Sequence, residues 1–141
     1  MRPQYHLIAS FLLALIFFYF TKSTLTSLLC FFSGFLIDLD HFIDFWLYKR
    51  KITFSKEFFS EYYKRFGRMY VLFHSFELVL MLWIFFLVFD FEIIGLGIIL
   101  GMVSHLLMDL WGNPVHTLSY FFTYRFLKGF DLNHICVMNN E

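Results

Sequence analysis

Four long apolar segments limit what this chain can fold into. They cover Tyr5–Phe20, Leu25–Trp46, Met69–Phe89 and Ile93–Trp111. A helix that crosses a bilayer needs about 20 mostly apolar residues, and each segment reaches a span only when the ionisable residues near one end are counted. Hydrophobic residues make up 60% of the 141 residues and charged residues only 16%. The pattern predicts one all-α domain over residues 1–141, an integral membrane four-helix bundle. A soluble bundle with an unusually apolar core is the alternative.

Charge and cysteine content exclude several other classes. Eleven basic and eleven acidic residues cancel, so no overall basic field indicates a nucleic-acid partner. Low charge with abundant Phe, Leu and Ile argues against a disordered tail. Cys30 and Cys136 form no CxxC pair, which argues against a disulfide framework and excludes a cysteine-based zinc site.

The basic residues predict an orientation in the membrane. Seven of the eleven lie between the second and third segments: Lys49, Arg50, Lys51, Lys56, Lys64, Arg65 and Arg68. By the positive-inside rule the 47–68 loop is cytoplasmic, and both termini are then cytoplasmic as well. No small-residue cleavage site follows the first segment, so we expect it to be retained. These features predict a multi-pass protein of the inner (cytoplasmic) membrane.

Two further helices are expected outside the four spans. Phe54, Phe58, Tyr62 and Phe66 recur every four residues with charged residues between them. This pattern is typical of an amphipathic helix in the membrane interface, or of one packed on the end of the bundle. The apolar stretch 118–130 follows Pro114 and indicates a short C-terminal surface helix or re-entrant element.

Histidines and carboxylates gather at the predicted cytoplasmic ends of all four segments. The candidate metal ligands are His6, Asp40, His41, His74, His105, Asp109 and His116. Asp38 could also be a ligand, or it could orient His41. Several of these residues are three or four residues apart, a spacing that places two side chains on one helix face. Buried carboxylates cost several kcal/mol unless they are paired or bind a cation, and a divalent ion would offset that cost. Nitrogen and oxygen ligands without thiolates suit zinc, manganese or iron.

Simpler interpretations stay open for individual residues. A membrane histidine such as His6 can be an interhelical hydrogen-bonding residue. Asp44 is predicted to pair with Lys49 or Arg50 at the interface, and Glu77 can orient His74. His134 in the polar tail is expected to be solvated.

Three motifs resemble a known family. They are Asp38-Leu39-Asp40-His41, Phe73-His74-Ser75 and the G-x-x-S-H-L-x-x-D run over residues 101–109. They resemble the small inner-membrane, metal-dependent hydrolase-like proteins of bacteria and archaea, which are thought to be related to the zinc-dependent phospholipase C and nuclease superfamily. The resemblance implies one or two divalent ions, zinc first. It implies a ligand set that comprises His6, Asp40, His74, His105, Asp109 and His116. The superfamily's second H-x-x-x-E pair is missing here, because only His134 follows.

The leading hypothesis is therefore a membrane-embedded hydrolase of a phosphoester or phosphoanhydride in a lipid or lipid-linked substrate. Asp38, Asp40 and Asp109 are its candidate catalytic residues, and Lys64, Arg68 or Arg125 could neutralise the phosphate. One alternative is divalent-metal binding or transport, which the nearly pure Phe, Leu and Ile content of the extracellular half disfavours. Another is a structural protein whose cluster only holds the helices together.

Overall fold

The computed structural model describes residues 3–50 and 66–137. This part of the chain is all-α and contains no β-strand, which confirms the predicted class. Backbone contacts divide the chain into two compact units. Unit 1 comprises residues 1–37 and 75–113, and unit 2 comprises residues 38–74 and 114–141. The expectation of a single domain stays a prediction.

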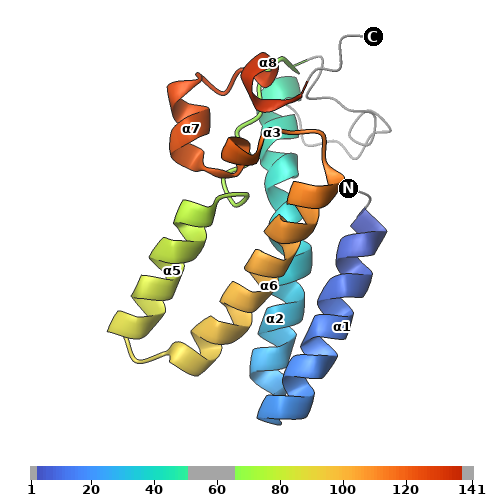
Figure 1. The fold of residues 1–141 in the computed structure, drawn as a ribbon, viewed down its shortest axis with the longest axis vertical. Helices are drawn as coiled ribbons and strands as arrows, with labels where there is room; N and C mark the ends of the chain where they lie inside the picture. The colour runs from blue at the N-terminus through green and yellow to red at the C-terminus, as the bar shows by residue number, and fades with distance from the viewer. Residues whose placement is uncertain (1–2, 51–65, 138–141) are drawn as a thin grey trace. The chain divides into compact units, whose positions relative to one another are not determined.

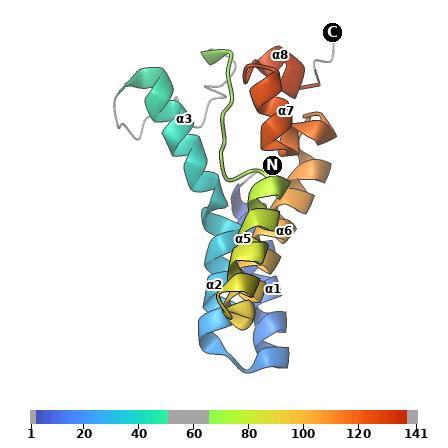
Figure 2. The same cartoon turned by 90° about the vertical axis from the view of Figure 1, so that its left-hand side faces the viewer.

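Unit 1 is a set of helices that lie side by side (Figures 1 and 2). They are α1 (Pro3–Thr21), α2 (Thr24–Leu36), α5 (Phe76–Val88) and α6 (Glu92–Gly112). Helix α6 packs against all of the other three, and α1 also packs against α2. Two of the helices begin at serine caps. The Ser23 hydroxyl accepts from the Thr26 N–H, and the Ser75 hydroxyl accepts from the Leu78 N–H, which satisfies donors that the first turn of a helix leaves open.

Glycines allow α2 and α6 to approach closely. A Cβ added at Gly97 would lie 2.5 Å from the Thr26 carbonyl oxygen, and one at Gly101 would lie 2.8 Å from the Gly34 nitrogen. No side chain fits at those separations, so the two backbones are in direct contact. The Ser33 hydroxyl adds a hydrogen bond of 2.9 Å to the Ile98 carbonyl. This contact sets how closely α6 lies against α2.

Two of the described helices, α1 and α6, are long and apolar enough to cross a bilayer. A buried core helix or an N-terminal signal helix meets the same criterion of length and composition. Many large apolar side chains of α1 are exposed, including Phe11, Leu12 and Ile16. In water such a surface would be a hydrophobic patch, whereas lipid would cover it.

The second and third predicted spans are interrupted. Helix α2 ends at Leu36, and the chain continues through the 3-10 turn η1 (Ile37–Leu39) into α3 (Asp40–Lys49). Helix α5 begins only at Phe76, after an irregular stretch. The prediction of continuous helices over 25–46 and 69–89 was therefore wrong. Aspartates at 38 and 40 and the cap at Ser75 favour helix ends over helix interiors.

Unit 2 consists of short elements joined by irregular backbone. Besides α3 it contains the 3-10 turn η2 (Thr117–Tyr120), α7 (Phe122–Leu127) and α8 (Leu132–Ile135). The Met69 N–H donates to the Phe130 carbonyl at 3.0 Å, and the Leu132 N–H donates to the Gly67 carbonyl at 3.0 Å. The expected short C-terminal helix corresponds to α7. The amphipathic helix expected around 54–66 falls largely on residues 51–65, which lie outside the described residues.

Candidate metal centre

Unit 2 brings three of the predicted ligands together with Asp38, and we call the four residues the α3 cluster: Asp38, Asp40, His41 and His74. Asp38 lies in η1, while Asp40 and His41 lie in the first turn of α3. His74 lies in the irregular stretch directly before Ser75. Within this cluster Asp40, His41 and His74 each offer a ligand atom, and these atoms lie within 4.8 Å of one another. The described residues thus include a partly buried His/Asp group that could hold a metal ion.

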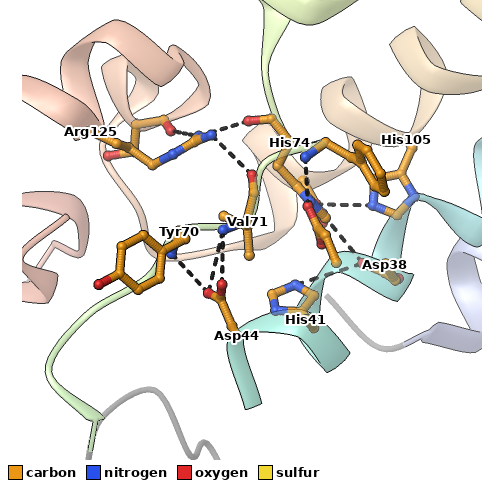
Figure 3. Close-up of polar contacts among 12 residues, drawn as sticks. Asp38, His41, Asp44, Tyr70, Val71, His74, His105 and Arg125 are labelled. Carbon is orange, nitrogen blue, oxygen red and sulfur yellow. Dashed lines mark hydrogen bonds and ion pairs between the residues drawn. The ribbon is translucent and has the colours of Figure 1, made fainter. Parts of the chain in front are cut away.

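The His74 ring lies between two carboxylates (Figure 3). Its Nδ1 is 3.0 Å from Asp40 Oδ2, and its Nε2 is 3.3 Å from Asp38 Oδ1. A neutral imidazole carries a single N–H, so only one of the two nitrogens can donate to a carboxylate. The other contact then brings a nitrogen lone pair against an anionic oxygen. Either a second proton on the ring or a cation shared by the two atoms relieves that repulsion.

The two carboxylate oxygens of Asp40 have different surroundings. Its Oδ2 accepts from the Phe73 N–H at 2.8 Å and faces the His74 ring. Its Oδ1 is buried and has no hydrogen-bond partner among the described residues. A buried carboxylate oxygen without a partner is costly, and the cost is removed when the oxygen binds a cation. Asp40 therefore fits a dual role, since one oxygen orients His74 and the other can contact an ion.

Unit 1 contains a second group, which we call the α6 cluster: His6 from α1 with His105 and Asp109 from α6. The His105 Nε2 atom lies 3.3 Å from Asp109 Oδ2, as expected for residues four apart on one helix. The His6 Nε2 atom lies 3.1 Å from Asp109 Oδ1. The same oxygen accepts a hydrogen bond of 2.8 Å from the Asn113 amide. All three members of the cluster are buried.

The tautomer of His105 follows from its other contact. Its Nδ1 lies 2.7 Å from the Gly34 carbonyl oxygen, which can only accept. The Nδ1 atom therefore carries the proton, and in the neutral ring Nε2 has only a lone pair to present to Asp109. This is the arrangement of a metal-binding histidine, whose second nitrogen donates to an oxygen that fixes the ring.

The two histidine rings of this cluster lie against each other. The rings of His6 and His105 are stacked with centroids 3.9 Å apart. The buried Nδ1 of His6 has no hydrogen-bond partner among the described residues. The cluster therefore offers nitrogen lone pairs beside a carboxylate, which is a donor set that suits zinc.

Asp44 has a different environment from the one predicted. It is buried rather than at the rim, and its carboxylate accepts from the Tyr70 N–H at 2.8 Å and from the Val71 N–H at 3.3 Å (Figure 3). Burial raises the pKa of Asp44 from 3.8 to about 6, although the two backbone donors and the charge of Arg125 act in the opposite direction. The prediction of a surface pair with Lys49 or Arg50 was wrong.

Arg125 is also buried, and it does not lie at the rim where it could neutralise a phosphate. Its guanidinium donates to the carbonyls of His74 at 2.7 Å and Val71 at 3.0 Å, and also to that of Ser119. Sequence periodicity missed both Asp44 and Arg125, because their partners are backbone groups distant in sequence. The only available signal was the presence of charge inside otherwise apolar stretches.

The remaining candidates lie away from these contacts. His116 is exposed, directly before η2. Glu77 accepts from the Ser75 hydroxyl at 2.6 Å, at the start of α5. His74 precedes that helix, so His74 and Glu77 do not share a helix face. His134 is exposed beside Asp131, as expected.

Comparison of the chain with protein-family models, with curated proteins and with solved structures finds no match. The functional proposal therefore depends on the residues of this chain alone.

Proposed function

We propose that this chain is a membrane protein that binds divalent metal ions, zinc in the first instance, with one ligand set in the α3 cluster and a separate one in the α6 cluster. We propose further that it uses the metal to hydrolyse a phosphoester or phosphoanhydride in a lipid or lipid-linked substrate. One observation carries the metal assignment. In each cluster a histidine has its Nδ1 engaged with an oxygen, while its Nε2 lies 3.3 Å from a carboxylate oxygen.

That separation fits a shared ion. Zinc binds imidazole nitrogen and carboxylate oxygen at about 2.0–2.2 Å with tetrahedral geometry, which places two of its ligand atoms about 3.3 Å apart. A direct hydrogen bond between the same two atoms would favour about 2.8 Å. Asp38 with His74 and Asp109 with His105 are therefore the ligand pairs that we assign.

Further contacts hold these ligands in place. Asp40 faces Nδ1 of His74, the Gly34 carbonyl accepts from His105, and the Asn113 amide donates to Asp109. Such partners set the ring orientation and raise the basicity of a metal-binding histidine. They also reduce the reorganisation that metal binding requires.

A divalent ion in such a site activates water and neutralises phosphate oxygens. The residue best placed to exchange a proton with a substrate is His41, because its side chain is 28% exposed. Its Nε2 lies 3.8 Å from Asp38 Oδ1, whose side chain is 29% exposed. Asp38 and His41 thus form the accessible edge of the α3 cluster, while Asp40 and His74 are buried behind them.

We base the proposed reaction class on the resemblance of the three motifs to the metal-dependent hydrolase-like family. We base the proposed lipid substrate on the exposed apolar surfaces of α1 and α6. A structural cluster that binds no substrate is the competing proposal. It is favoured if the protein contains metal but turns over no phosphoester.

The test is the metal content of the full chain, purified in detergent without chelator. We expect about one or two zinc ions per wild-type chain and a large loss in Asp109→Asn and His74→Ala. His134→Ala is the matched control, because His134 forms an exposed pair with Asp131 at 3.7 Å. Wild-type metal in Asp109→Asn would contradict the assignment. A screen of phospholipids and lipid phosphates then tests hydrolysis in the same preparations.

A further inference from the structure

The segment that carries His74 has neither helix nor strand to satisfy its backbone. Residues 70–74 lie between the isolated bridge at Arg68 and the cap of α5 at Ser75. Val71 has φ of +34°, a left-handed conformation that is unfavourable for a β-branched residue. Such a conformation persists only where the surroundings hold it in place.

Two buried charged side chains hold Val71 from opposite sides (Figure 3). Asp44 accepts from its N–H, and Arg125 donates to its carbonyl. Asp44 also accepts from the Tyr70 N–H. Because both side chains are almost fully buried, at 1% exposure each, water cannot substitute for these bonds.

The same guanidinium reaches the residue that carries the metal-binding ring. Arg125 Nη1 donates to the carbonyl of His74 at 2.7 Å. The planar fork of arginine donates to several carbonyls in a fixed geometry, whereas lysine keeps the charge without that geometry and glutamine loses the charge. The main chain of His74 is thus held by Arg125, while its ring is held by Asp40 at 3.0 Å.

We propose that Arg125 is a positioning residue, which sets the place of His74 by fixing the backbone of residues 71–74. The inference rests on the proposed metal-binding function, because its consequence is a change in metal affinity. A displaced His74 would no longer lie at the distance from Asp38 that a shared ion requires. In this proposal Arg125 acts through that backbone, because its guanidinium donates to the carbonyls of Val71 and His74.

The experiment measures two properties of the full chain in detergent: zinc affinity by competition with a chromophoric chelator, and backbone hydrogen exchange in metal-free protein. Arg125→Gln should weaken zinc binding about 10–100-fold, as loss of a partner that orients a ligand does. Exchange over residues 70–74 should accelerate at least about tenfold, while exchange in α6 stays as in the wild type. Arg125→Lys should recover part of both effects.

Lys128→Gln is the matched control, because it removes an exposed positive charge from the same part of the chain. It should change neither property. If Arg125→Gln does not fold, the same two properties are measured in Arg125→Lys, because lysine keeps the positive charge but lacks the planar guanidinium group.

If the wild type binds zinc, Arg125→Gln should change both the zinc affinity and the hydrogen exchange over residues 70–74. A change in only one of these two properties would contradict the proposal. Faster exchange in α6 as well would show a general structural role and would overturn it too. A wild-type chain that binds no zinc would contradict the proposed function instead. Exchange over residues 70–74 then decides the inference by itself, with acceleration supporting it and unchanged exchange refuting it.

Discussion

The Nε2 of His105 lies 3.3 Å from Asp109 Oδ2, one turn further along α6, while its Nδ1 donates to the carbonyl of Gly34 on α2. The contact with Gly34 leaves a lone pair on Nε2 that faces an anionic oxygen. That pairing needs a proton or a cation between the two atoms. The ring of His6 is stacked on that of His105, with centroids 3.9 Å apart, so both histidines lie beside the same carboxylate, and the cluster could hold a metal ion.

Removing the charge of Asp40 should weaken metal binding without unfolding the protein. Asp40→Asn keeps an oxygen that can accept from the Phe73 N–H, but it loses the anionic partner of the His74 ring. We expect zinc affinity to fall about 10–100-fold, measured by chelator competition. Asp131→Asn is the control, because asparagine also caps helices and Asp131 lies at the exposed start of α8. Equal affinity in the two variants would mean that Asp40 has no part in the site.

The contact between α2 and α6 should not tolerate a methyl group at Gly101. Alanine there would bring its Cβ against the backbone of α2 at Cys30 and Gly34. Overpacking of this kind costs about 1–3 kcal/mol, and a clash with backbone relaxes poorly. We expect Gly101→Ala to lower the thermal midpoint of unfolding in detergent. Leu107→Ala, at a half-exposed position of the same helix, should have a much smaller effect; an equal loss in both variants would show that the two backbones are not in close contact.

Asp44 should make stability depend on pH in the acidic range. Its pKa is raised to about 6 in the folded protein from an ordinary 3.8, so the folded state binds the proton more tightly than the unfolded state. The contribution is complete below about pH 4 and is lost as the pH rises to about 6, up to about 3 kcal/mol in total. Relative to Asp44→Asn, the wild type should therefore lose stability across this range. Parallel pH profiles of the two proteins in chemical unfolding would contradict the buried position of Asp44.

The orientation in the membrane can be tested with reporter fusions. Seven of the eleven basic residues lie in the 47–68 loop, so a fusion after Lys51 should report a cytoplasmic location and one after Lys22 the opposite side. A periplasmic signal from the fusion after Lys51 would refute the predicted topology, and with it the argument that all the candidate ligands lie at one depth.

The sequence predicted the long helices better than the irregular segments. Apolar length was sufficient for α1 and α6, and the spacing of four between His105 and Asp109 predicted their contact correctly. Hydropathy could not show the break after Leu36 or the late start of α5 at Phe76, because apolar residues continue through both. Helix ends depend on local capping and on partners that are remote in sequence.

The same limitation explains the errors at Asp44 and Arg125. Both were assigned to the surface by their charge, the ordinary expectation for ionisable residues. Their actual partners are main-chain groups of residues 70–74, which no side-chain pattern reveals. Tyr70 and Val71 give no sign in the sequence that their backbone needs such partners.

The most direct test of the central claim is zinc X-ray absorption on the detergent-purified full chain. The account predicts nitrogen and oxygen ligands at about 2.0–2.1 Å, with the outer-shell scattering of at least one imidazole. It also predicts that Asp109→Asn and His74→Ala each bind less zinc than the wild type, whereas His134→Ala binds as much. Absence of zinc, or sulfur ligands at about 2.3 Å from Cys30 or Cys136, would contradict the assignment of the His/Asp clusters as the metal centre.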